Sequence, residues 1–144
     1  MSNQVIEHVY DLDVFVSGMH GVPGRGGIAI CCAENLSSWH IIGALAIGFQ
    51  PFSYSNISCK AVIGNPLGLH LEPTKGKEMI DLKSFQHVRV HCWLGLSDIL
   101  RGHGFNVDGI RGTGYYPLPP ILAKVMARVD ARHAAFLVVK VKKL

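Results

Sequence analysis

"VFVSGMHGVPGRGGIAI", residues 14–30, decides how the fold of this chain is interpreted. A segment rich in glycine and proline separates two apolar runs, Val14 to Val16 and Ile28 to Cys32. Both runs are typical of β-strands, and Gly and Pro commonly turn the chain between strands. A phosphate-cradling loop would instead open a helix, whose N-terminus stabilises an anion. The sequence therefore predicts a connection between two strands here, and not a nucleotide-binding loop.

Length and composition indicate one globular domain. The chain has 144 residues, of which 49% are hydrophobic and 17% charged, and the apolar residues are spread along it. This composition predicts a single domain over residues 1–144 with a buried core. The longest apolar run, Ile41 to Phe49, is too short for a membrane span. No secretory signal is recognisable at the N-terminus, so we expect an intracellular protein, cytoplasmic or nuclear.

The rest of the chain reads as alternating elements. We expect a third strand over Trp39 to Phe49, a helix from about Ile57 that Pro66 interrupts or kinks, and a strand over His87 to Cys92. A short helix from Leu94 to Leu100 and an irregular loop from Gly102 to Gly114 are predicted next. We then expect a helix from Pro120 and a strand from Ala134 to Val141. The apolar face of that helix consists of Ile121, Leu122, Val125, Met126 and Val129.

This order resembles the ribonuclease H-like superfamily, and local motifs point the same way. The opening stretch is similar to that family's first loop, D-G-S-x-x-x-N-P-G-x-G-G, with Pro23, Gly24, Gly26 and Gly27 in register. "YSNISCKAV" and "VRVHCWLGLSDILRG" resemble its first helix and its fourth strand. The resemblance implies an α/β fold with a mixed sheet of about five strands, the first three antiparallel, with helices packed on it. It also implies that the family's C-terminal helix is missing.

The catalytic carboxylates of that family do not carry over. The matching positions are Ser17, Cys59 (or Lys60 with a shift of one) and Cys92 or Trp93, none of them acidic, and hydroxyl and thiol groups cannot hold two Mg²⁺ ions. These three are therefore vestigial positions, and the resemblance implies a catalytically inactive domain. The cysteines, Cys31 and Cys32 included, read as buried thiols. No C-x₂₋₄-C spacing is present among the cysteines, so neither a metal site nor a cofactor is predicted.

The positive charge lies at the C-terminal end. Residues 101–144 hold eight Lys/Arg against two Asp/Glu, a balance of +6, whereas residues 1–100 hold six against eight, a balance of −2. Such a surface attracts phosphate backbones. We therefore expect a module that binds RNA or another nucleic acid, related by analogy to inactive domains of viruses and retroelements. The predicted contact residues are Arg101, Arg111, Lys124, Arg128, Arg132, Lys140, Lys142 and Lys143.

Two alternatives come from other classes of function. The first is a scaffolding homo-oligomer or protein-interaction domain whose exposed apolar strands form the interface. The second is an unorthodox enzyme: a nuclease using Asp11, Asp13 or Asp98, or a Cys–His hydrolase with Cys59 as nucleophile. The absence of the family's carboxylates favours the non-enzymatic interpretations.

Overall fold

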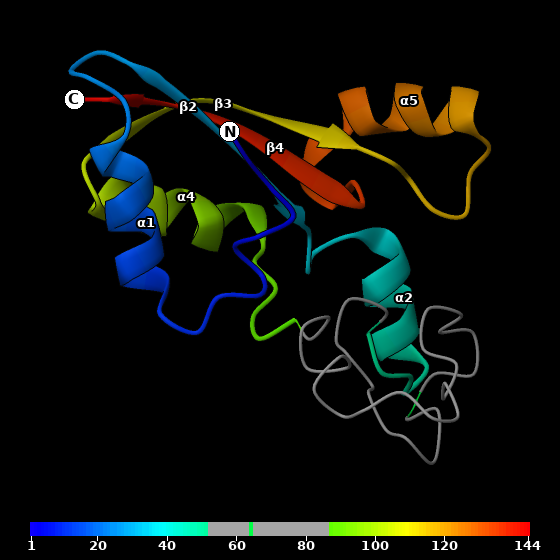
Figure 1. Ribbon diagram of the computed structural model, residues 1–144. Helices are drawn as coiled ribbons and strands as arrows, with labels where there is room; N and C mark the ends of the chain where they lie inside the picture. Colours follow the sequence, from blue (N-terminus) through cyan, green and yellow to red (C-terminus); the bar gives the residue numbers. More distant parts are fainter. Residues whose placement is uncertain (52–63, 65–86) are drawn as a thin grey trace, which may run out of the picture.

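The fold is a mixed α/β arrangement around a four-stranded sheet (Figure 1). It is seen in a computed structural model that describes residues 1–51, 64 and 87–144. The strands are β1 (Ser2–Asn3), β2 (Ile28–Glu34), β3 (Phe105–Thr113) and β4 (Phe136–Lys143). The helices of the described part are α1 (Leu12–Gly21), α2 (Trp39–Ala46), α4 (Trp93–Gly102) and α5 (Pro120–Val129), with a 3₁₀ turn, η1 (Ala131–His133).

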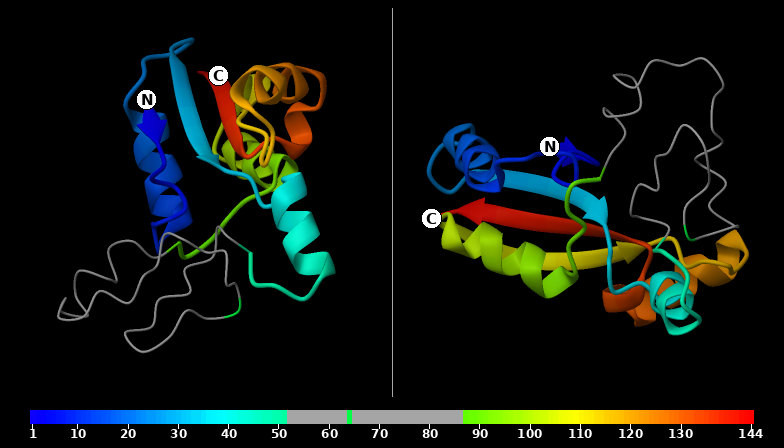
Figure 2. Two further views of the ribbon diagram at one scale, coloured as in Figure 1. Left: turned by 90° about the vertical axis from the view of Figure 1, so that its right-hand side faces the viewer. Right: turned by 90° about the horizontal axis from the view of Figure 1, so that it is seen from below.

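The last strand occupies the middle of the sheet. The strand order is β1-β2-β4-β3, with β1 parallel to β2 and with β4 antiparallel to both β2 and β3. The view from below in Figure 2 shows the N-terminus beside β2 and α5 beyond the end of β3. Residues 137, 139 and 141 of β4 point into the core, where Leu96 and Leu100 of α4 join them.

The first predicted strand is wrong, because Val14 to Val16 lies within helix α1. Asp11 caps this helix, and its side chain accepts a hydrogen bond from the Val14 amide at 2.9 Å. The side chains that α1 turns toward the core are spaced three and four residues apart, which is the helical repeat: Leu12, Phe15, Val16 and Met19.

The third predicted strand is also wrong, since Trp39 begins helix α2. Ser38 stands at the N-cap position, and Ile41 and Ala44 are the buried residues one turn apart. With helices at both places, the chain has no run of three antiparallel strands, and the described sheet has four strands rather than about five. This topology contradicts the ribonuclease H-like prediction.

Strand β3 replaces the irregular loop predicted over Gly102 to Gly114. Gly109 lies at a β-bulge, where the register with β4 shifts. Gly112 allows η1 to approach the strand, because a Cβ there would come within 2.9 Å of the Ala131 backbone and closer still to Ala134. These glycines therefore adapt a strand to its neighbours and do not break it.

Several predicted elements are confirmed, with shifted ends. Strands β2 and β4 and helices α4 and α5 lie where the sequence indicated. The strand predicted over His87 to Cys92 is reduced to a single bridge between His91 and Asn35. The helix predicted from Ile57, with Pro66, lies outside the described residues. Across those residues, we find no helix with the length and apolar character needed to cross a membrane.

Helix α5 packs on the fold through small residues. Its buried side chains are those of Ala123 and Ala127, with Met126 partly buried beside them. The apolar face expected in the core is therefore largely wrong, because its four other members are 52% to 81% exposed: Ile121, Leu122, Val125 and Val129.

We predict that Gly112→Ala destabilises the fold, whereas Gly109→Ala does not. Overpacking of this kind costs about 1–3 kcal/mol, and the new methyl group at residue 112 would meet the η1 backbone. Gly109 lies on the same strand, and a Cβ there would meet no heavy atom within 4 Å. Gly109→Ala is therefore the matched control. Chemical denaturation would measure both variants, and equal midpoints would contradict the close packing of η1 on β3.

Candidate functional site

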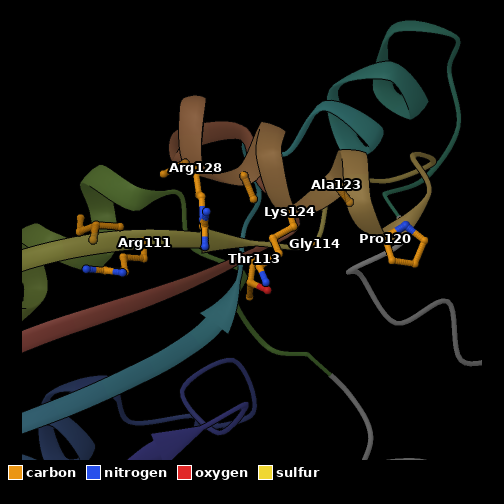
Figure 3. Close-up of a pocket in the computed structure, with 11 residues that line it drawn as sticks. Arg111, Thr113, Gly114, Pro120, Ala123, Lys124 and Arg128 are labelled. Atoms are coloured by element: carbon orange, nitrogen blue, oxygen red, sulfur yellow. The ribbon is translucent and has the colours of Figure 1, made fainter.

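A groove runs between the edge strand β3 and helix α5. Its volume is about 640 Å³, within the range of small-molecule sites. Figure 3 shows Lys124 and Arg128 reaching from α5 toward β3. The residues that line the groove are Ile110, Arg111, Gly112, Thr113, Gly114, Pro120, Ala123, Lys124, Ala127, Arg128 and Ala131.

The groove is positively charged. Arg111, Lys124 and Arg128 line it, and no acidic side chain does. Within the described part of the chain, none of these three cations lies within 4.0 Å of a carboxylate. Their charges are therefore available to an anionic ligand, and the guanidinium groups can form paired hydrogen bonds with phosphate oxygens.

The sequence of α5 places its two cations by simple periodicity. Ala123 and Ala127 face the fold one turn apart, and the residues that follow them, Lys124 and Arg128, lie together along the rim. Pro119 and Pro120 begin the helix and lack backbone N–H groups. The helix N-terminus thus offers fewer free amides than usual, and the positive character of the groove comes mainly from side chains.

The other five predicted contact residues lie elsewhere. Arg101 pairs with Asp98 at 3.7 Å, and Lys140 lies 3.8 Å from Asp108. The Arg132 guanidinium lies 4.5 Å from the centre of the Trp93 ring. Lys142 is exposed on β4, and Lys143 donates a hydrogen bond to the His20 carbonyl at 3.0 Å. The structure therefore gathers three of the eight into one groove.

The vestigial positions do not converge. Ser17 Oγ is 3.2 Å from His103 Nδ1, at the C-terminal end of α4, whereas Cys92 is the N-cap of that helix. Ten helical residues separate the two ends by about 15 Å. Cys59 lies outside the described residues. This separation is a second reason why the inactive ribonuclease H-like assignment is wrong.

The three carboxylates of the nuclease alternative serve other purposes. Asp11 caps α1, Asp98 pairs with Arg101, and Asp13 Oδ1 lies 2.9 Å from His103 Nε2. Ser17, His103 and Asp13 thus form a chain in the order used by serine hydrolases. The carboxylate of such a triad is normally buried, whereas that of Asp13 is 80% exposed. The chain therefore links α1 to the end of α4, and the nuclease alternative is wrong.

The hydrolase alternative named Cys59, which lies outside the described residues, and the described cysteines offer no substitute for it. Burial raises the pKa of the Cys31 thiol to about 12, with further contributions from Cys32 and Glu7, so it cannot act as a nucleophile. Cys32 and Cys92 are only partly buried, and neither is hydrogen-bonded to a histidine in the described chain. The scaffold alternative expected exposed apolar strands, whereas four of the exposed large apolar residues in the described part lie on helix α5: Ile121, Leu122, Val125 and Val129.

Asp130, at the C-cap of α5, joins three side chains through hydrogen bonds. Its Oδ2 accepts hydrogen bonds from Tyr115 Oη at 2.8 Å and Trp39 Nε1 at 3.0 Å, and His133 Nδ1 lies 2.8 Å from Oδ1. Desolvation acts to raise the pKa of Asp130, but the bonds from His133, Trp39 and Tyr115 outweigh it and lower that pKa. Four separate segments thus meet on one carboxylate at the C-terminus of α5.

Side chains of the types that bind metals gather at a different place. The described residues bring Glu7, His8 and His87 together beside β2, on the other side of β4 from the groove. Sequence spacing did not reveal this cluster, because the N-terminal turn and the segment before α4 are far apart in the chain. Nor did it reveal the Asp130 network, which only the packing of α2 and η1 creates.

Comparison with known proteins gives no family for this chain. No family model and no curated protein matches it. One similar solved structure is an S-adenosylmethionine-dependent methyltransferase from Mesorhizobium loti, with 16% identity over 99% of this chain and a TM-score of 0.48. Another is a putative S-adenosylmethionine-dependent methyltransferase from Listeria monocytogenes, with 12% identity over 99% of this chain and the same TM-score.

This chain spans 60% of each of those two chains. At this level of similarity the two structures supply no site residues, so any function has to be argued from the side chains themselves.

We predict that Asp130→Asn lowers the free energy of unfolding by about 1–3 kcal/mol at neutral pH, because charged hydrogen bonds are weakened. The lowered pKa of Asp130 stabilises the fold at pH values above the unfolded value of about 3.9, and this contribution is lost as pH falls through the folded value. Denaturation between pH 7 and 3 would measure it. A loss of stability on acidification that is as steep in Asp130→Asn as in the wild type would contradict this role.

Proposed function

We propose that this protein binds a phosphate-bearing small molecule in the groove between β3 and α5. The observation that carries the proposal is the cluster of Arg111, Lys124 and Arg128, three cations without a carboxylate partner in the described chain, around about 640 Å³. Three positive charges suit a ligand with two or more negative charges. Such contacts are charge-assisted and direct the phosphate into one geometry.

The groove favours a compact ligand over a polymer. A strand of nucleic acid requires a continuous row of cations and accessible aromatic rings. Here Arg101 and Lys140 are paired with acids, and Tyr115 is buried and bonded to Asp130. Tyr116 is 53% exposed, but its ring packs against His40 and Phe136. A small ligand is supported because the positive charge is concentrated in the groove. Few neighbouring side chains could continue the contacts along a nucleic-acid strand.

Thr113 and the edge of β3 supply the neutral half of the groove. Thr113 lines it, and β3 is an edge strand of the sheet that the described residues form, so no other described strand pairs with its outer backbone groups. A phosphate held between α5 and β3 would thus meet Lys124 and Arg128 from α5, and Arg111 together with neutral donors from β3.

We expect pyrophosphate to bind the full chain, and Lys124→Ala or Arg128→Ala to weaken binding about tenfold or more, since a charge-assisted hydrogen bond contributes about 1.5–3 kcal/mol. Isothermal titration calorimetry would measure both variants at two salt concentrations, with the weaker affinity at the higher one. Arg101→Ala is the matched control, because Arg101 lies outside the groove and is paired with Asp98.

Two results would contradict the proposal. One is the absence of pyrophosphate binding even at low salt. The other is binding that Arg101→Ala weakens as much as Arg128→Ala does, because this would show general attraction to a basic surface and not a site. Circular dichroism of each variant would establish that the fold is retained.

A further inference from the structure

Glu7, His8 and His87 bring three side chains to one point. One ligand atom from each lies within 4.8 Å of the other two, and the His8 and His87 rings are in edge contact with centroids 4.6 Å apart. Nitrogen and oxygen ligands bind a transition-metal ion at about 2.0–2.2 Å. Ligand atoms around one ion are therefore separated by less than twice that length, and small side-chain adjustments would close this cluster on an ion.

The backbone fixes the cluster from both sides. The Glu7 carbonyl accepts hydrogen bonds from the Val88 amide at 2.7 Å and the Arg89 amide at 3.2 Å. Arg89 Nη1 in turn donates to the Tyr10 carbonyl at 2.8 Å. These hydrogen bonds tie the turn that carries Glu7 and His8 to the residues directly after His87. The backbone therefore holds the side chains of Glu7, His8 and His87 close to one another.

The Glu7 carboxyl group has no hydrogen bond to compensate for its burial. The residue is 1% exposed, and within the described structure neither carboxyl oxygen has a hydrogen-bond partner. A buried carboxyl group without a partner destabilises a fold, and coordination to a cation is one of the few ways to compensate.

A second carboxylate supports the histidine. Glu34 Oε2, at the end of β2, lies 3.6 Å from His87 Nδ1 and is itself buried without a hydrogen bond. A carboxylate beside a metal-binding histidine makes the ring more basic and helps to orient it. Glu34 therefore stands where a supporting group for His87 is expected.

From this arrangement we propose that Glu7, His8 and His87 bind a divalent transition-metal ion of the zinc class. Two imidazole nitrogens and one carboxylate suit Zn²⁺ or a neighbouring first-row ion, whereas Mg²⁺ and Ca²⁺ prefer oxygen ligands alone. Three protein ligands leave a coordination position for water or another small ligand. The site is independent of the phosphate groove, so either can fail without the other.

The first experiment measures metal binding by the full chain. After treatment with a chelator, Zn²⁺ is titrated into the wild type, Glu7→Gln and His87→Ala, with Mg²⁺ as a second titrant. We expect one Zn²⁺ per chain, no Mg²⁺ binding, and at least a tenfold loss of Zn²⁺ affinity in both variants, as even outer-shell substitutions cause. His20→Gln is the control, because this histidine packs against Phe105 away from the cluster.

The second measurement separates metal binding from a structural role of Glu7. Glu7→Gln keeps the shape of the side chain and removes its charge, so we expect the metal-free variant to melt at or above the wild-type temperature. Zn²⁺ should raise the melting temperature of the wild type and leave that of Glu7→Gln unchanged. The absence of Zn²⁺ binding in the wild type, or equal Zn²⁺ affinity in the wild type, Glu7→Gln and His87→Ala, would overturn the proposal.

Discussion

The position of β4 between β2 and β3 is the constraint on which the rest of the structure depends. Both neighbours form their antiparallel ladders with this strand, and Leu137, Val139 and Val141 bring its core face against α4. Because β4 follows every other element in sequence, the sheet closes only when the C-terminal end of the chain is in place. Each proposed site then lies beside one partner of β4, the groove at β3 and the metal cluster at β2.

The sequence predicted those elements in which local pattern and tertiary packing agree. Strand β4 and helix α4 are examples, since each has its apolar residues at the spacing that its own structure needs. In α1, Val14 and Val16 favoured a strand, but Asp11 and the core-facing residues Phe15 and Met19 follow the helical repeat. A capping residue directly before the apolar run was the signal that the strand interpretation overlooked.

The candidate sites were less predictable, for a physical reason. The charges of Arg111, Lys124 and Arg128 are visible in the sequence, but their separation from Lys140 and Arg101 depends on ion pairs formed only in the fold. The glycines around β3 predicted a loop, because the close approach of η1 that Gly112 permits is a tertiary contact. The sequence shows which residues are charged, but only the packing of the fold brings these charges together.

The groove exists because α5 meets the fold through small side chains. Burying Ala123 and Ala127 contributes little, since a buried methylene-sized group is worth about 0.8 kcal/mol. Apolar contact alone therefore cannot fix how far α5 stands from β3, and the polar bonds of Asp130 to Tyr115 and Trp39 have to do so at the end of the helix. Asp130 therefore helps to hold α5 in place beside β3, although it does not itself line the groove.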